Sequence, residues 1–375
     1  MFDPSNSFVS RETSHLHRFN FEFNLSSTHW WLNFRLPMTY ARRELRYDRG
    51  EIHALIHRNR LLFNEASPFL EWRNNRHHIN LNWKIKTIEP GMTNLVGYMD
   101  TTDPLFIIQG NPDLKNATKV ETWLTYSNRN ADGGPGGNYA GVTVSYGYLA
   151  NGISMVSDYN TSTGVRKATY MNVNGNWDAS VAASIIRRMK RFDINTRLEA
   201  KHVTSVDMMA QDGSGLSRSK VYSNGASYRL NANYSFPGVK IGFNFDGLFN
   251  RFTSNRPEFT NQNTWNFKTG LNGVVSLPAN FQISADLTMY NRRGFTDDAL
   301  NTDNFVLNAR LSKSILNGSL IFMLDGYDIL HDLSNVSYAV NAQGRTETYR
   351  TVLPRYFMFH VQWRFNHTPR KIRRR

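Results

Sequence analysis

Histidine pairs are the first residues of this chain whose spacing could hold a ligand. His15 and His17 are two residues apart, so on a strand both side chains point to the same face and could chelate a metal. No Asp or Glu lies at a spacing that would complete a ligand set for them or for the adjacent His77 and His78. We therefore interpret the histidines as polar groups of a sheet and predict neither a metal site nor a cofactor.

Carboxylates and hydroxyls form no recognisable catalytic set either. Asp297 and Asp298 lie in a loop segment rich in turn residues, so we expect them to be solvated. A hydrolase needs a nucleophile, a histidine and an acid in one place, and nothing in the sequence ties His360 to such a triad. Residues 212–216 contain two glycines, but they do not lie between a strand and a helix, as a phosphate-binding loop does. We predict that the chain is not an enzyme.

The charge of the chain is strongly basic, at +14 over 375 residues, and cysteine is absent. Five of these charges belong to the C-terminal tail, Arg370, Lys371, Arg373, Arg374 and Arg375. The other basic residues alternate with apolar ones and form no single patch, so we predict no nucleic-acid binding. A polar lumen or contact with anionic lipid explains them, and we expect the tail, residues 367–375, to lie in the periplasm.

Apolar residues recur at every second position from end to end, which predicts an all-β chain. We expect fifteen antiparallel strands with turn residues between them. The expected strands are 11–25, 29–46, 59–72, 75–88, 118–127, 139–160, 165–187, 190–206, 220–236, 239–252, 263–277, 279–292, 304–315, 318–331 and 355–366. The segment 139–160 contains Gly147, Asn151 and Gly152, so we expect a bulge or bend there.

The last expected strand separates its two faces most clearly. One face carries Phe357, Phe359, Val361, Trp363 and Phe365. The other carries Tyr356, Met358, His360, Gln362 and Arg364. Because successive strand residues point to opposite faces, one face is apolar and aromatic while the other is polar. We predict that the first set contacts lipid and the second lines a watery lumen.

Two environments fit such a face: the lipid around a membrane barrel and the interior of a soluble sandwich. No run approaches the roughly 18–20 apolar residues of a spanning helix. Aromatic residues make up 13% of the chain, which suits the aromatic girdles of a membrane barrel. The number of alternating strands also favours an antiparallel transmembrane barrel wall.

The expected connections alternate between short and long, as they do between periplasmic turns and extracellular loops. The expected long loops are 47–58, 89–117, 207–219, 253–262, 293–303 and 332–354; the turn 128–138 and the loop 161–164 break the rule. With the last strand ending in the periplasm, the first strand starts outside the cell. Bacterial barrels have an even number of strands, so fifteen indicate a barrel without its first strands. The start of the chain also carries no export signal.

One loop motif and the C-terminal region resemble a known family. The motif Gly110-Asn111-Pro112-Asp113-Leu114-Lys115 is similar to the "GNPxLKPE" element of TonB-dependent outer-membrane receptors, with Asn116-Ala117 in place of Pro-Glu. The C-terminal segments that also resemble it are Tyr327-Asp328-Ile329-Leu330, Asn341-Ala342-Gln343-Gly344 and Leu353-Pro354-Arg355-Tyr356-Phe357-Met358. Together these segments resemble the Bacteroidetes-type outer membrane protein beta-barrel family.

The resemblance implies a plugged 22-stranded barrel that takes up a scarce nutrient with energy from TonB. Its partners are outer-membrane lipid, a small nutrient and, through an N-terminal plug, the TonB complex. We therefore expect residues 1–375 to be one outer-membrane barrel domain without its plug, with ligand contacts from the long loops after residue 88. Two alternatives remain open: a complete smaller porin or fatty-acid-transporter-like channel, and a secreted soluble β-sandwich binding protein. The ligand itself cannot be named from the sequence.

Overall fold

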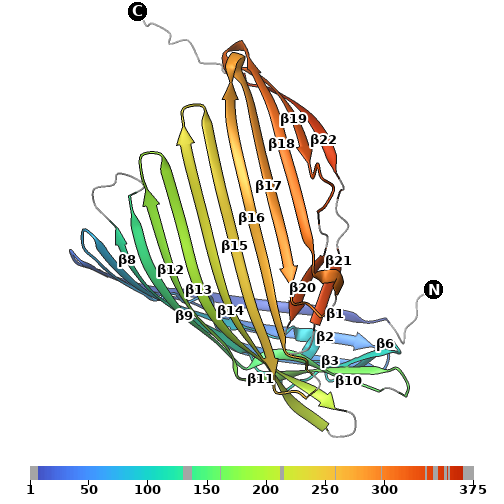
Figure 1. The fold of residues 1–375 in the computed structure, drawn as a ribbon. Helices are drawn as coiled ribbons and strands as arrows, with labels where there is room; N and C mark the ends of the chain where they lie inside the picture. The colour runs from blue at the N-terminus through green and yellow to red at the C-terminus, as the bar shows by residue number, and fades with distance from the viewer. Residues whose placement is uncertain are drawn as a thin grey trace, which may run out of the picture.

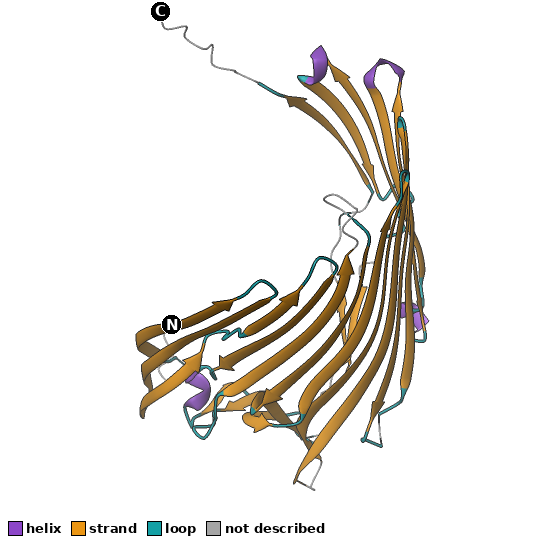
Figure 2. Cartoon of the chain, turned by 90° about the vertical axis from the view of Figure 1, so that its left-hand side faces the viewer, coloured by secondary structure: helices purple, strands orange, loops and turns teal. Residues whose placement is uncertain are grey.

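The fold is known from a computed structural model of the chain. It describes residues 7–129, 137–160, 162–211, 215–257, 259–296, 298–333, 336–340, 345–349, 353 and 355–365. One large antiparallel sheet dominates and forms a curved, open wall (Figures 1 and 2). The basic tail 367–375 and the loop residues Asp212 and Asp297 lie outside the described residues.

The wall has fifteen strand positions from β1 to β22, as expected from the alternation, and the third of them is divided into β3 and β4. The first strands are β1 (Val9–Ser26), β2 (Trp30–Arg49), β3 (Ile52–Phe63), β4 (Phe69–Arg73), β5 (His77–Ile88), β8 (Ala117–Arg129), β9 (Tyr139–Ala150) and β12 (Asn176–Arg188). The others are β13 (Phe192–Gln211), β14 (Gly215–Phe236), β15 (Val239–Ser254), β16 (Gln262–Leu277), β17 (Phe281–Arg293), β18 (Asp303–Ile315), β19 (Leu320–Tyr327) and β22 (Tyr356–Trp363).

The two faces of the wall differ in polarity because the pairing register keeps like side chains together. On one face Arg229 lies opposite Asp246, and Arg310 opposite Asp325. We call this charged face the inner face. The outer face carries the apolar residues, and many of its large side chains are exposed, such as Leu271 at 55%. A one-residue slip in any strand would exchange its faces, so the polarity specifies the register.

Aromatic side chains form rows near both ends of the outer face. Towards the long loops, ring centroids follow one another from Tyr146 to Trp177 at 6.1 Å, to His202 at 4.6 Å and to Tyr222 at 6.3 Å. Next to the short turns lie the pairs Trp30–Trp72, Phe192–Tyr234 and Trp363–Phe365. From Phe192 to His202 a strand rises roughly 34 Å, or roughly 25 Å across a membrane at a tilt of about 45°. The two rows therefore have the spacing of the aromatic girdles of a membrane barrel.

The wall has two open edges, β1 and β22, and each is paired on one side in the described sheet. β1 ends at the short turn 27–29, and Trp363 near the end of β22 lies opposite Leu320, next to the short turn 316–319. Both edge strands therefore run from the long-loop end of the wall to the short-turn end. Direct pairing between them would be parallel, whereas every pairing within the wall is antiparallel.

Two expected loops are strands instead. β2 continues to Arg49 and β3 begins at Ile52, so the expected loop 47–58 is reduced to the turn at Gly50 and Glu51. β13 continues to Gln211 and β14 begins at Gly215, so the expected loop 207–219 is mostly a hairpin. Beyond the apolar band the outer side of β2 is polar, as in Arg42, Glu44 and Arg46, whereas Leu45 and Tyr47 lie on the inner side. The row of apolar outer residues that marks the strands is therefore missing there.

Two expected long strands are each broken in two. The segment 139–160 divides at Asn151 into β9 and β10 (Gly152–Tyr159), which confirms the expected bend. The segment 165–187 divides into β11 (Arg166–Val173) and β12. The expected loop 161–164 thus belongs to the β10–β11 hairpin, which is part of a long connection between β9 and β12. This connection therefore fits the alternation of short turns and long loops that the sequence predicts.

The two longest connections contain structure of their own. The segment expected to be irregular, 89–117, contains the 3₁₀ turn η1 (Met92–Leu95) and strands β6 (Met99–Asp103) and β7 (Phe106–Gln109). These two strands join β10 and β11 in a four-stranded sheet, in which β7 and β11 are parallel. The expected loop 332–354 contains the hairpin of β20 (Val336–Val340) and β21 (Arg345–Tyr349).

Helical structure is limited to short turns in the described part of the chain. Besides η1 these are η2 (Pro278–Asn280), η3 (Asp298–Leu300) and η4 (Leu316–Gly318). Among the described residues, no helix is long and apolar enough to span a membrane.

Leu287 and Thr288 are neighbours on β17 that test the polarity of the two faces. Leu287 lies on the outer face and is 37% exposed, whereas Thr288 points to the inner face. We expect Leu287→Arg to lower the free energy of unfolding in lipid vesicles by about 2–4 kcal/mol, because its charge enters hydrocarbon. Thr288→Arg serves as the control and should change it by less than about 1 kcal/mol, because its charge reaches water. Urea titration of vesicle-refolded protein measures both, and equal losses would contradict a lipid-facing outer surface.

Candidate functional site

The motif loop 110–115 belongs to a compact platform on the inner face of β2 and β3. The platform consists of residues 89–116 and the hairpin β10–β11. Its apolar core joins two wall residues, Leu45 and Tyr47, to Met92, Leu95, Val96 and Leu114. Leu114, from the motif, is 4% exposed. The motif therefore anchors the loop to the wall through its leucine.

Backbone contacts explain the first residues of the motif. A side chain at Gly110 would put a Cβ atom 1.9 Å from the carbonyl oxygen of Val96, so glycine is required for this close approach. Asn111 donates from Nδ2 to the carbonyl oxygen of Tyr170 at 2.8 Å, and its Oδ1 accepts from the backbone N–H of Asp113 at 2.9 Å. Asn111 thus forms a tight turn and ties it to β11.

The last residue of the motif is held by a neighbouring asparagine. The backbone N–H of Lys115 donates to Oδ1 of Asn172 at 2.7 Å, and Nδ2 of Asn172 donates to the carbonyl oxygen of Lys115 at 3.0 Å. The side chain of Asn172 also donates to the carbonyl oxygen of Asn151 at 2.9 Å. One asparagine therefore joins the motif loop, β11 and the bend between β9 and β10.

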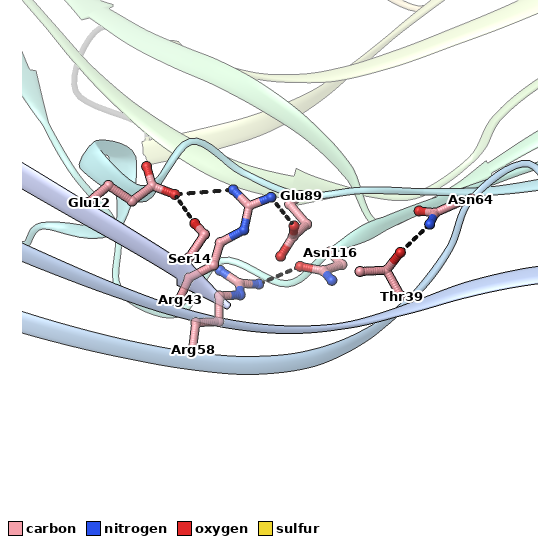
Figure 3. A network of polar contacts seen from close by, with 8 residues as sticks. All are labelled: Glu12, Ser14, Thr39, Arg43, Arg58, Asn64, Glu89 and Asn116. Atoms are coloured by element: carbon pink, nitrogen blue, oxygen red, sulfur yellow. Dashed lines mark hydrogen bonds and ion pairs between the residues drawn. The ribbon is translucent and has the colours of Figure 1, made fainter. Parts of the chain in front are cut away.

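Two arginines of the wall hold the two ends of the 89–116 segment (Figure 3). Arg43 on β2 forms ion pairs with Glu12 on β1 at 3.3 Å and with Glu89 at 2.9 Å. Arg58 on β3 is buried and donates to the carbonyl oxygen of Leu114 at 3.0 Å and to Oδ1 of Asn116 at 2.6 Å. Because a buried arginine is costly without partners, these contacts require the platform to stay on the wall.

A third arginine fixes strand β6 of the platform. Arg49 is buried, donates to Oδ1 of Asp100 at 2.9 Å and stacks over the ring of Tyr98 at 4.8 Å. Thr102 donates to the same carboxylate from its hydroxyl at 2.7 Å and from its backbone N–H at 3.0 Å. The hydroxyl of Thr102, helped by its N–H and by Arg49 and opposed by partial burial, lowers the pKa of the Asp100 carboxyl below its ordinary value.

The platform also reaches across to the far part of the wall. Ser154 on β10 donates a short hydrogen bond to Asp207 on the extended part of β13, and Asp207 is buried. The platform thus links β2–β3 to β13 on the inner face at the long-loop end. A packed surface with strands of its own lies here, where the sequence predicts long loops.

Residues of the last strand lie as their alternation predicts. Phe357, Phe359, Val361 and Trp363 are 55–66% exposed on the outer face, and Phe365 is 80% exposed. Their contact with lipid stays a prediction. Tyr356, Met358, His360, Gln362 and Arg364 lie on or follow the inner face.

A cluster on the inner face contains His360 and could not be found from the sequence. Asp325 on β19 is 3% exposed and accepts from Arg310 on β18, with one contact at 3.1 Å. Nε2 of His360 lies 3.0 Å from the same carboxylate but outside hydrogen-bond geometry. The three residues are far apart in sequence, and the strand register alone brings them together. Arg310 and His360 both lie beside the Asp325 carboxylate, and the cluster contains no nucleophile.

The other histidine and carboxylate candidates remain dispersed. His15 lies opposite Arg42, and His77 stacks on Tyr126, whereas His78 lies 3.3 Å from Glu71. Across the described part of the chain, no group of three or more histidines and carboxylates is close enough to hold a metal. Asp298 begins η3, and its neighbour Asp297 is outside the described residues.

One family model matches part of the chain. Residues 69–239, from β4 to the start of β15, match the model of the outer membrane protein beta-barrel family. The matched region is similar to outer-membrane β-barrels and includes the motif loop and the whole β10–β11 hairpin, which implies a location in the outer membrane. Searches of curated proteins and of solved structures find no match.

Arg58 and Arg60 provide a matched test of the platform. Arg58 is buried against the 89–116 segment, whereas Arg60 is exposed on the same strand. We expect Arg58→Met to speed trypsin cleavage after Lys115 about tenfold, because the loss of charged hydrogen bonds to Leu114 and Asn116 makes local opening about 1.5 kcal/mol easier. Arg60→Met is the control and should cleave at the original rate. Equal cleavage of both variants would show that Arg58 does not hold the platform.

Asp100 makes the docking of the platform depend on pH. Its pKa is lowered in the folded protein, so its contribution to stability is present above the ordinary value of 3.8 and is lost as the pH falls through the lower folded value. Hydrogen exchange of the β6–β7 amides, corrected for intrinsic rates, should therefore accelerate below about pH 3.8. In Asp100→Asn these amides should exchange faster at neutral pH and lose this step. A step of the same size in both proteins would assign it to other carboxylates.

Proposed function

We propose that the chain is the wall of an outer-membrane receptor barrel that binds a small nutrient and passes it inward with energy from TonB. The observation that carries this proposal is the opposite polarity of the two faces. An exposed apolar surface between two aromatic rows suits lipid, and a charged, asparagine-rich inner surface suits a water-filled path. The mechanism is binding and gated passage without chemical change of the ligand.

The platform supports the receptor part of this proposal. It contains the motif that resembles TonB-dependent receptors, and it lies at the long-loop end, which corresponds to the cell exterior. A folded surface at this end can contact a ligand before the ligand enters the barrel. Ligand contacts from the other long connections, 255–261, 294–302 and the β19–β22 connection, belong to the same proposal.

The direction of the edge strands supports the idea of an incomplete barrel. Because β1 and β22 run the same way, an all-antiparallel barrel needs an odd number of further strands between them. Seven more strands would raise the fifteen wall positions to the 22 of a plugged transporter barrel. We propose that these strands and the plug come from a preceding segment of the same receptor, and that the plug contacts TonB.

The two alternatives account for less of the structure. A complete porin of 14 or 16 strands would have edge strands running in opposite directions, unlike β1 and β22. A soluble β-sandwich would cover the apolar faces of its strands with a second sheet, whereas Leu271 and Phe359 are more than half exposed. The receptor barrel explains both observations.

Single cysteines test the orientation, since the chain has none of its own. Leu105 lies between β6 and β7 and is 60% exposed, and Leu316 lies between β18 and β19 and is 63% exposed. In intact cells, a membrane-impermeant maleimide should label Leu105→Cys and leave Leu316→Cys unlabelled. Permeabilising the outer membrane should make both react. Labelling of both cysteines in intact cells, or of neither after permeabilisation, would contradict the proposed topology.

Uptake tests the function itself. A strain without this protein should grow more slowly on one scarce nutrient at low concentration and normally at high concentration, because diffusion through general porins then suffices. Loss of TonB should cause the same defect, and the two losses together should not add. Growth defects that are independent of TonB would favour a passive channel.

A further inference from the structure

A groove on the inner face of β13–β17 is separate from the platform and from the motif loop. It is a cavity of about 510 Å³ on the side that the inner face borders. Residues from all five strands line it, and the register places those that point to the inner face in two rungs. The first rung is Arg197, Arg229, Asp246, Lys268 and Tyr290, and the second is Glu199, Ser227, Leu248, Asn266 and Arg292.

The first rung puts two like charges side by side. Arg197 on β13 lies directly opposite Arg229 on β14, an arrangement that destabilises a sheet without counter-charges. Glu199 pairs with Arg197 at 2.9 Å, and Asp246 pairs with Arg229 at 2.5 Å. Each arginine therefore has one carboxylate, and both carboxylates of the groove are used by these pairs.

Lys268 adds a further positive charge to the same rung. Its register partner is Asp246, which already holds Arg229, and its Nζ lies 5.8 Å from the centre of the Tyr290 ring. Within the described residues it forms no ion pair, and it is exposed to the groove. The groove is therefore lined by more cations than carboxylates, because Arg197, Arg229 and Lys268 face only Glu199 and Asp246.

The remaining lining residues can recognise an organic molecule. Ser227 and Asn266 supply hydrogen-bonding groups, and Leu248 and the ring of Tyr290 supply apolar surface beside the charges. A metal cation has no free carboxylate here, and a neutral sugar would leave the positive excess unmatched. An anion that presents carboxylate or phosphate oxygens to Arg229 and Lys268 matches the charge.

We infer that this groove binds a small organic oxyanion, a carboxylate or a phosphate ester, on the path through the barrel. The inference rests on the proposed function, because it names the class of nutrient that the wall would accept. Lys268 is the main contact, since Arg197 and Arg229 already hold carboxylates. Asp246 competes with the ligand for Arg229 and Lys268 and so limits the affinity.

The test is calorimetric titration of the full chain in detergent micelles at constant ionic strength. Succinate and inorganic phosphate are the two anionic probes, and glucose is the neutral one. We expect one or both anions to bind and glucose not to bind, and the anion with the higher affinity identifies the source of the oxygens. Absence of binding by both anions would overturn the inference.

Three variants separate a site from general attraction to a basic protein. Lys268→Gln should weaken anion binding about tenfold, and Asp246→Asn should strengthen it several-fold, because it removes a competing carboxylate. Lys240→Gln is the matched control: Lys240 is also exposed on the inner face, six residues from Asp246 on β15 or about 20 Å away, and should bind like the original protein. Equal effects of Lys268→Gln and Lys240→Gln would overturn the inference.

The outcome can be read independently of the proposed function. Circular dichroism of each variant establishes that the sheet has formed. Correct cysteine labelling at Leu105 and Leu316 together with no anion binding would reject the groove and retain the receptor proposal. Anion binding in a protein with the opposite orientation would retain the groove and reject the receptor.

Discussion

This structure depends on one constraint: the strands must form an unbroken hydrogen-bonded ladder while their side chains alternate between two environments. Every backbone N–H and C=O group within hydrocarbon must have a partner, so a wall in lipid can tolerate few gaps between its strands. The same ladder sends successive side chains to opposite faces. The fifteen wall positions satisfy both demands at once, with apolar residues on the outer face and charged and amide residues on the inner face.

The ladder continues beyond the apolar band, and this extension makes the platform possible. β2, β13 and β14 each have 20 residues or more, about twice the length needed to cross a membrane. The extra length of β2 carries Leu45, Tyr47 and Arg49 to the level at which the 89–116 segment can pack on them. Wall and platform thus share a small apolar core and a set of buried arginines. A long connection, which would lose much conformational entropy on ordering, is held by these contacts.

Much of the wall could be predicted because alternation is a local property. All fifteen expected strands correspond to wall positions, and the bend at Asn151 was expected from its neighbours. The errors fall where the outer face becomes polar beyond the apolar band. In β2 the outer residues Arg42, Glu44 and Arg46 are polar, whereas Leu45 and Tyr47 lie on the inner side, so the row of apolar outer residues ends there and the following segment, 47–58, resembles a loop. In the hairpin of β13 and β14, polar residues such as Asp207, Arg218 and Ser219 interrupt the apolar positions in the same way. Strands β6 and β7 of the platform were not predicted because they are short and because β7 pairs in parallel with a distant strand.

The sequence by itself determined the all-β character, the number of wall strands and the polarity of each face, since each depends on residues close together in the chain. Tertiary structure alone decided which charges meet. Arg310, Asp325 and His360 form one cluster, and Arg197 lies beside Arg229, because the register of several successive strand pairs places them at one level. A register results from the packing of a whole strand against its neighbours, and no single segment contains that information. The buried place of Arg58 has the same origin, since its partners at Leu114 and Asn116 are supplied by a connection that folds back onto the wall.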